Sequence, residues 1–410
     1  MPVAEYIKSG KEKLDNKKYR EAIFDFNNAL TFDPSNTESL ILRGISKAEL
    51  GNNQESIDDF NKALKIDPKN TLALTNRGIS KAEMGKYQEA IEDFNLALKI
   101  DPKNILALNN RGISNNELKK HEEAIADYNK ILELDPTYTN AYFNRALARM
   151  DMGSHNLAIE DLDKVIQTNP EDLQAYYQRA IAYSETEQFS KAIADYNKII
   201  EKDPNIDTYT NRALARMNLN NYQEAISDLN KAIELDPDFA WSYYWRGIVK
   251  ERQNNYSDAI DDFTRAISLD QNNADFFQER AITKAGHNKT KDALKDLDKA
   301  VELDSNNMLS YFYRIIFSCD INNQPSEEDC KKIVELAPDS VETYFIYGLM
   351  KQIRGDIFGA IKIYNEVMKL TPQNSFIYGR CKKQKRTLVR RCIALLIIIA
   401  SIIFLFVKFS

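Results

Sequence analysis

The 410-residue sequence is poor in the residues on which most enzymes and metal sites depend. It contains three histidines, and Ile125 stands where a second histidine would complete a zinc-binding helix with His121. Its four cysteines all fall late in the chain and lack metal-ligand spacing: Cys319, Cys330, Cys381 and Cys392. The segment Ser9-Gly10-Lys11 lacks the other residues of a phosphate-binding loop. We therefore expect no enzyme activity, no metal and no other cofactor.

Glycine and proline are also scarce, with 13 and 11 residues, and neither gathers into a linker. The first fifteen residues have no apolar central region, so we expect no secretory signal peptide there. The chain has 61 acidic and 55 basic residues, and eight of the bases follow Phe376, where no acid occurs. The preceding part is therefore acidic. This argues against a nucleic-acid partner, because binding a phosphate backbone requires clustered lysine and arginine.

The prolines recur at a nearly constant interval of 34 residues, with two steps of 33. The markers are Pro34, Pro68, Pro102, Pro136, Pro170, Pro204, Pro237, Pro338 and Pro372, with Gln271 and Ser305 at the equivalent place in two units. They define eleven units. In residues 71–104, apolar and small residues four apart predict a first helix that ends at Gly85. A second apolar stripe predicts another helix, which Pro102 stops because proline lacks a backbone donor.

Small residues recur in both helices of these units, and an aromatic residue or leucine follows the second small residue by four places. In residues 71–104 these are Gly78, Ala90 and Phe94. This period and pattern resemble the tetratricopeptide repeat. The resemblance implies an all-α fold, an α-solenoid in which helix-turn-helix repeats form a right-handed superhelix. Each hairpin would bury its apolar faces only against neighbouring copies.

The last residues differ from the repeats. We expect residues 1–374 to form the array of about eleven repeats, residues 375–391 a capping helix and basic juxtamembrane segment, and residues 392–407 a transmembrane helix. Twelve Ile, Leu, Phe or Val residues between 393 and 407 favour insertion by about 4–7 kcal/mol in total. The alternative is a buried capping helix. It is less favoured because this segment lacks the polar outer face of a soluble cap.

Basic residues flank the apolar run mainly on its N-terminal side. They are Lys382, Lys383, Lys385, Arg386, Arg390 and Arg391, with only Lys408 beyond the run. This asymmetry predicts a single-pass, tail-anchored protein whose repeats face the cytoplasm. Anionic lipid attracts such a segment by about 1 kcal/mol per base, so the run is also predicted to tune the choice of membrane. For the cysteines beside it, packing is favoured over acylation.

An arginine precedes the small residue of the first helix in nine units, and an aspartate precedes the aromatic position of the second helix in ten. In residues 71–104 these are Arg77 and Asp93. One interpretation is a row of arginines that receives carboxylates or phosphates from a partner. We favour the other, a ladder of intramolecular ion pairs, since a paired arginine suits a packed interface better.

The family resemblance implies that the first helices line a concave surface which binds peptide or helical segments of partner proteins. The lining residues would include Asn76, Asn110, Asn144, Tyr177, Asn211, Trp241, Tyr244 and Phe312. Amide side chains suit an extended peptide because they both donate and accept hydrogen bonds. Isoleucines occupy the place of the asparagine clamp that the chaperone-tail-binding subgroup uses, which makes that role doubtful: Ile45, Ile79 and Ile113.

An acidic column in the early first helices suggests that this surface has two chemically different halves. Its members are Glu49, Glu83, Glu117, Asp151 and Glu185. The column ends at Asn218, and aromatic residues concentrate after it, with Trp241, Tyr244 and Phe312 predicted to face outward. The alternative is that the acids form a solvated stripe and the aromatics belong to the repeat core.

These observations together predict a membrane-anchored scaffold for protein or peptide partners, with no small-molecule substrate. The alternative is a soluble structural array whose apolar tail docks into a partner complex.

Overall fold

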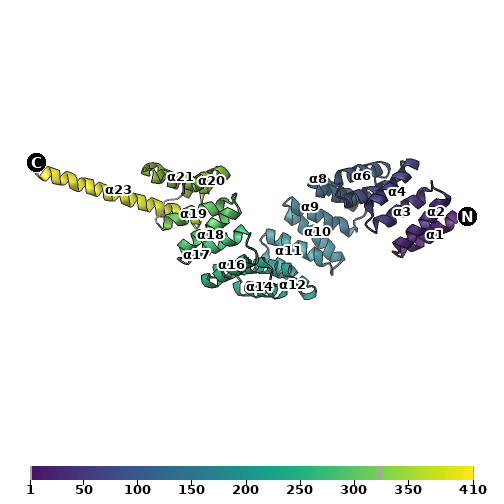
Figure 1. Ribbon diagram of the computed structural model, residues 1–410, viewed down its shortest axis with the longest axis horizontal. Helices are drawn as coiled ribbons and strands as arrows, with labels where there is room; N and C mark the ends of the chain where they lie inside the picture. The colour runs from purple at the N-terminus through teal and green to yellow at the C-terminus, as the bar shows by residue number, and fades with distance from the viewer. Residues whose placement is uncertain (1, 322–325, 410) are drawn as a thin grey trace. The chain divides into compact units, whose positions relative to one another are not determined.

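The computed structural model describes residues 2–321 and 326–409, and of these the side chains of residues 2, 391 and 395–409 are outside the description. Within the described residues the chain forms 23 helices and no strand, as the all-α prediction requires (Figure 1). The chain divides into two compact units, Met1–Leu219 and Asn220–Ser410.

In the first unit, α1 to α12 form six antiparallel hairpins and α13 follows them. The helices are α1 (Pro2–Asp15), α2 (Tyr19–Phe32), α3 (Thr37–Ala48), α4 (Asn53–Ile66), α5 (Thr71–Glu83), α6 (Tyr87–Ile100), α7 (Ile105–Glu117), α8 (His121–Leu134), α9 (Thr139–Asp151), α10 (His155–Thr168), α11 (Leu173–Glu185), α12 (Phe189–Lys202) and α13 (Ile206–Asn218). Each second helix also packs on the first helix of the next hairpin, which gives a continuous repeat stack.

In the second unit, α14 precedes four hairpins and a long final helix. The helices are α14 (Tyr222–Leu235), α15 (Ala240–Arg252), α16 (Tyr256–Leu269), α17 (Ala274–Gly286), α18 (Thr290–Leu303), α19 (Met308–Asp320), α20 (Glu327–Leu336), α21 (Val341–Ile353), α22 (Ile357–Leu370) and α23 (Phe376–Phe409). The hairpins stack in the same way as those of the first unit, so both units are built from one kind of repeat.

The helix ends in residues 71–104 lie where the sequence predicts them. The Asn70 side chain accepts a hydrogen bond from the backbone of Ala73, 3.0 Å away, and so caps the first turn of α5. Gly85 follows α5 with φ +73°. This left-handed conformation lets the backbone N–H groups of Gly85 and Lys86 bond back to the last turn of α5, at 2.8 and 2.9 Å.

Among the turns that the structure describes, six others place a residue with a Cβ in the same left-handed conformation, where glycine is favoured. They are Lys17, Lys119, Glu187, Asn220, Asn254 and Asn288, with φ between 58° and 63°. The three asparagines tolerate this conformation better than the two lysines and the glutamate do. These turns therefore hold local strain that the packing of the flanking helices maintains.

The small residue of the first helix faces the aromatic position of the second. A Cβ added to Gly78 would lie 2.6 Å from the ring of Phe94, so only glycine fits there without a shift. Where the facing residue is leucine, as in the pair Ala146 and Leu162, the small position is alanine, and both side chains are fully buried. Ala180, which faces Tyr196, is an exception in which both side chains are buried, so the size of one residue limits the size of the other without dictating it.

In the repeat formed by α19 and α20, the large and small residues exchange places. Ile315 occupies its small position and Cys330 its aromatic position, and both are buried. A large residue on α19 therefore compensates for a small one on α20. Burial also raises the pKa of the Cys330 thiol to about 11, which keeps it protonated at neutral pH and suits a packing residue.

The first part of α23 packs on α21 and α22. Cys381 and Leu388 are buried in the same core as Tyr364, and Arg380 holds both carboxylate oxygens of Asp320 on α19, at 2.6 and 2.7 Å. Cys381 lies inside this core, and its burial raises the pKa of its thiol to about 12. Both observations support packing over acylation at this residue. The start of α23 thus closes the apolar face of the last repeat.

In the described part of the chain, no helix combines the length and apolar character needed to cross a bilayer. The predicted transmembrane segment, residues 392–407, falls mostly on residues whose side chains lie outside the description. The side chains of Arg391 and Lys408, predicted to flank it, lie outside the description as well.

Candidate partner-binding surface

The recurring arginines are paired within the chain, which confirms the favoured interpretation. Arg43 donates to both carboxylate oxygens of Asp59, at 2.8 and 2.6 Å, and also to Asn27 of the preceding repeat, at 2.7 Å. Lys47 adds a second cation, 3.0 Å from Asp59. The same pairing recurs at Arg77–Asp93, Arg111–Asp127, Arg145–Asp161, Arg179–Asp195, Arg246–Asp262, Arg280–Asp296 and Arg314–Asp329. These arginines hold repeats together and do not form a row that waits for anions.

The predicted groove amides of the first unit also have partners inside the chain. Asn76 and Asn110 each donate to a backbone carbonyl four residues earlier, at 2.8 Å. Asn144 donates to Asn109 of the preceding repeat at 3.1 Å, and Asn211 to the hydroxyl of Tyr177 at 3.0 Å. A peptide bound here would have to use the remaining amide oxygens or displace these bonds. The binding role of these five residues stays a prediction.

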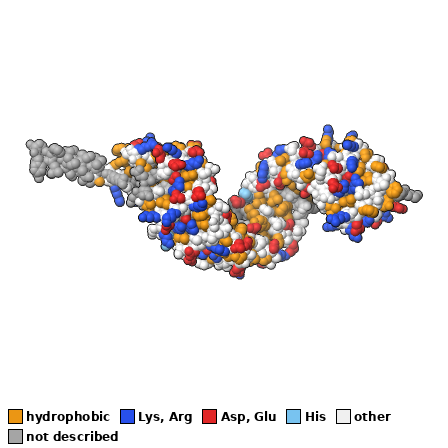
Figure 2. All heavy atoms as spheres, viewed as in Figure 1, with side chains coloured by type: hydrophobic (Ala, Val, Ile, Leu, Met, Phe, Trp, Pro, Cys, Tyr) orange, Lys and Arg blue, Asp and Glu red, His pale blue; other side chains and the backbone are white. Residues whose placement is uncertain are grey.

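The acidic column lies at the C-terminal ends of α3, α5, α7, α9 and α11. Its members are all exposed: Glu49, Glu83, Glu117, Asp151 and Glu185. On the face seen in Figure 2, acidic and basic side chains are interspersed over the first unit. Exposed charges of this kind interact weakly because water and salt screen them. A role for the column in attracting a basic partner stays a prediction.

The second unit carries an aromatic cluster on α15 and α17. The ring of Tyr244 lies 5.1 Å from Trp241, 5.0 Å from Trp245 and 5.3 Å from Phe276. Phe276 is fully buried, whereas Trp241, Tyr244 and Trp245 are half-buried. The three half-buried rings therefore lie partly exposed beside the buried ring of Phe276, which is typical of a binding anchor.

The prediction that Phe312 faces outward is wrong. Its side chain is only 2% exposed and packs between Tyr313, 5.8 Å away, and Phe345 of α21, 6.1 Å away. The next repeat contributes an aromatic ring that covers this position. Phe312 therefore belongs to the core of the second unit.

Two carboxylates accompany the aromatic cluster. Burial, together with the charges of Glu251 and Asp275, raises the pKa of Glu279 to about 7, and the hydrogen bond from Gln278 partly offsets the rise. Within the described residues, the Glu279 side chain accepts one hydrogen bond, from Gln278 at 3.4 Å, and no lysine or arginine pairs with it. Burial also raises the pKa of Glu251. The half-buried Trp241, Tyr244, Glu251, Glu279 and Tyr313 are named the aromatic–acidic site below.

The carboxylates influence the tyrosines of this site as well. Burial raises the pKa of Tyr313, and the charges of Glu279 and Glu251 add to the effect. Burial likewise raises the pKa of Tyr244, with a contribution from Glu279. First helices of three successive repeats thus bring two carboxylates and two tyrosines together, and of the two carboxylates Glu251 has a nearby cation, Arg252. A cation with an apolar stem is the ligand that these groups would accept best.

The sequence prediction missed Glu251, Glu279 and Tyr313. The signal was present in the repeat register, because the position of Asn76, Asn110, Asn144 and Asn211 becomes Trp245, Glu279 and Tyr313 in later repeats. Glu251 similarly occupies a position held by Ala48 and Ala82 in early repeats. A residue that departs from the repeat consensus marks a position at which the fold does not require one particular side chain.

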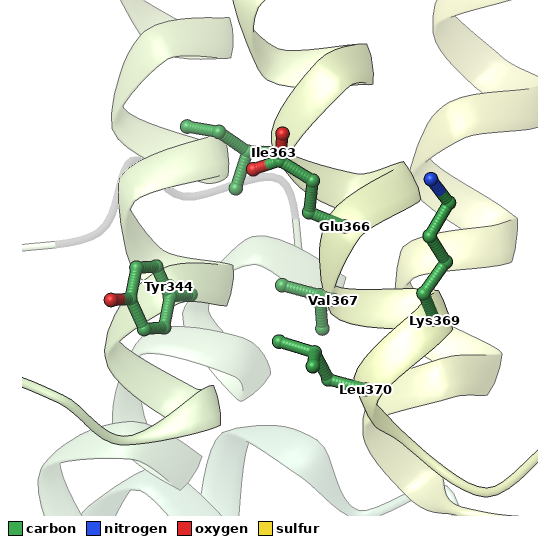
Figure 3. A pocket seen from close by; sticks show the side chains of 6 residues that line it. All are labelled: Tyr344, Ile363, Glu366, Val367, Lys369 and Leu370. Carbon is green, nitrogen blue, oxygen red and sulfur yellow. The ribbon is translucent and has the colours of Figure 1, made fainter.

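A separate cavity of about 360 Å³ lies at the last hairpin (Figure 3). Tyr344 of α21 faces Ile363, Val367 and Leu370 of α22, and Glu366 and Lys369 lie beside them. None of these residues was predicted to bind a partner. Among the described residues, no group of three or more His, Cys, Asp or Glu side chains is arranged to hold a metal ion.

Profiles of known families match this chain over more than half of its length. The tetratricopeptide repeat profiles match residues 71–104, 105–138, 173–206 and 240–273 and, in a second version, residues 37–70 and 139–172. A further TPR repeat profile matches residues 213–254. The chain therefore belongs to the tetratricopeptide repeat family, as its period and small residues predicted. No curated protein sequence matches it.

Solved structures of repeat proteins resemble the chain at low identity. The C-terminal part of a TPR repeat-containing protein from Cytophaga hutchinsonii is 19% identical, with a TM-score of 0.50, over 58% of this chain and 97% of that one. Yeast Tom70 is 18% identical, with a TM-score of 0.47, over 95% of this chain and 96% of Tom70. YrrB, described as a TPR protein with an unusual peptide-binding site, is 22% identical, with a TM-score of 0.37, over 45% of this chain and 95% of YrrB. At 19% identity, the Cytophaga hutchinsonii structure supports only the repeat fold of this chain.

Proposed function

We propose that the protein is a non-catalytic scaffold that binds a segment of a partner protein at the aromatic–acidic site. A lysine or arginine of that segment would pair with Glu279 and Glu251, with its stem against Tyr244 and Trp241. The observation that carries this proposal is a half-buried carboxylate with a pKa of about 7 and no basic partner among the described residues. Burying such a charge is costly, and an arriving cation would offset that cost.

The test uses the intrinsic fluorescence of the chain, because both of its tryptophans lie on α15, with Trp241 in this site and Trp245 beside Tyr244. Peptides that pair one lysine or arginine with apolar neighbours are titrated into the wild type and the Glu279→Gln variant. A binding peptide is expected to change tryptophan emission, and the substitution is expected to weaken its binding about tenfold or more. Glu302→Gln, at an exposed position of the same unit, is the matched control and is expected to have no effect.

Binding should also strengthen as the pH rises through 7, because the cation selects the ionised form of Glu279. Peptides that bind equally well to the wild type and the Glu279→Gln variant, at every pH, would refute the proposed site. The acidic column of the first unit is the alternative. Its participation would appear as a loss of affinity in Glu83→Lys with Glu117→Lys, mainly through slower association at low salt.

We further propose that the scaffold is attached to a membrane by residues 392–407, with its repeats on the cytoplasmic side. The support is the composition of this run, which is apolar apart from Ser401, and the basic residues before it. Extraction with alkaline carbonate tests the attachment. A spanning helix would keep the protein in the membrane pellet, whereas a soluble array whose tail docks into a partner complex would be released.

A further inference from the structure

A groove between α22 and α23 is lined by four basic side chains and, among the described residues, by no acidic one. The bases are Lys382, Lys385, Arg386 and Arg390, all on α23. Met368, Tyr378 and Val389 complete the lining, and the groove has a volume of about 490 Å³. This volume is in the range of pockets that bind small ligands.

Packing against the last repeat fixes which side of α23 forms the groove. Cys381 and Leu388, two helical turns apart, are buried against α21 and α22. Lys382, Arg386 and Arg390 follow one another at intervals of four and form a stripe beside that buried seam. The stripe is about 12 Å long at 1.5 Å per residue. Lys382, Arg386 and Arg390 therefore lie about one helical turn apart, and Lys385 precedes Arg386 by one residue.

Two other bases in the described part of α23 are neutralised, whereas the four groove bases are not. Arg380 and Lys383 both pair with Asp320, at 2.6 and 3.6 Å. In the described part of the chain no carboxylate pairs with the groove bases, and the Lys382 ammonium lies 5.9 Å from the ring centre of Tyr378. Cations grouped in this way repel one another, and a ligand with several negative charges would relieve that repulsion.

We propose that this groove binds the headgroup of a glycerophospholipid that carries more than one phosphate. The proposal rests on the membrane attachment proposed above, because Arg390 precedes the apolar run at Cys392 by two residues and would lie at headgroup depth. Four cations match several phosphate charges better than one phosphodiester. Met368 and the exposed Val389 would contact the glycerol and first methylene groups, for which a free phosphate compound has no counterpart.

The test is calorimetric titration of the full chain in non-ionic detergent with a soluble short-chain lipid, dioctanoyl phosphatidylinositol bisphosphate. The test variant replaces Lys382, Lys385, Arg386 and Arg390 with serine. The matched control replaces four exposed bases of the same unit that lie outside the groove: Lys331, Arg354, Lys362 and Lys369. We expect affinity to fall about fivefold for each groove base removed, hence at least 100-fold in the test variant. The control variant should keep the wild-type affinity.

Three further ligands separate the sources of negative charge. Dioctanoyl phosphatidylserine, inositol hexakisphosphate and a polyglutamate peptide are each expected to bind at least tenfold more weakly than the bisphosphate lipid. Equal binding of the inositol phosphate would overturn the lipid assignment in favour of a free phosphate compound. Equal binding of the peptide would overturn it in favour of an acidic protein, and no binding of the lipid would overturn it outright.

Because the probe is soluble, this experiment does not depend on whether the tail spans a bilayer. A chain that carbonate releases but that binds the probe would refute the membrane anchor and leave the groove standing. A chain that resists carbonate but does not bind the probe would refute the groove alone.

Discussion

Replacing Glu279 with glutamine is expected to stabilise the second unit at alkaline pH. The folded state holds the pKa of Glu279 at about 7, above the 4.5 of an unperturbed glutamate. Between these values the unfolded chain loses its proton before the folded chain does. The folded state therefore binds more protons, and its stability falls as the pH rises through this window. The penalty is fully absent below pH 4.5 and fully present above pH 7.

The size of the effect follows from the shift. About 2.5 pKa units at 1.36 kcal/mol each give an upper limit of about 3 kcal/mol. Glu279 is partly exposed, and water reduces this value, so about 1–3 kcal/mol is expected. The groups that face it are Glu251 and Asp275, which add to the penalty, and Gln278, which reduces it. Glutamine keeps the shape of the side chain and cannot ionise.

The assay is urea unfolding followed by tryptophan fluorescence at pH 5 and pH 8, because both tryptophans report on the second unit. The wild type should lose stability between these values, whereas Glu279→Gln should lose less and exceed the wild type at pH 8. Glu302→Gln, at an exposed site, should follow the wild type. Equal pH slopes for the wild type and Glu279→Gln, or a less stable variant at pH 8, would show that Glu279 is not held in the environment inferred here.

Four further perturbations test the repeat architecture and the topology. Gly78→Ala should cost about 1–2 kcal/mol of unfolding free energy, since the new Cβ meets Phe94 at 2.6 Å, and Phe94→Leu in the same chain should recover part of it. Lys119→Gly should gain about 1 kcal/mol in urea unfolding, because Lys119 has φ +61°; no gain would contradict strain at this turn. Asp59→Ala should cost about 3–5 kcal/mol by the same measurement, because it leaves Arg43 and Lys47 without their shared carboxylate; a loss below 1 kcal/mol would mean that the carboxylate is solvated. Asn255 and Asn288 are exposed and begin N-glycosylation sequons. When the protein is synthesised with secretory-pathway membranes, both should stay unglycosylated if the repeats face the cytoplasm, and a shift in mass on glycosidase treatment would contradict that topology.

Much of this protein was determined by the sequence alone, because each repeat contacts only its neighbours. The period of 34 residues, the small residues and the prolines predicted both the helical hairpins and the turn at Gly85. The pairing of Arg77 with Asp93 was predictable for the same reason, since the repeat places these two residues 16 apart in the chain, and other repeats keep this separation to within one residue. Local patterns are sufficient where all contacts are between adjacent copies.

Tertiary structure decided the features that depend on departures from the repeat. Phe312 was predicted to face outward, yet Phe345 of the next hairpin covers it. Glu279 is an ordinary helix residue in the sequence, and its pKa of about 7 arises because surrounding groups bury its carboxylate near Glu251 and Asp275. The groove bases acquire a common direction only because Leu388 and its neighbours anchor α23 on the last repeat. Burial and direction of this kind depend on side chains from other helices, which no single stretch of sequence contains.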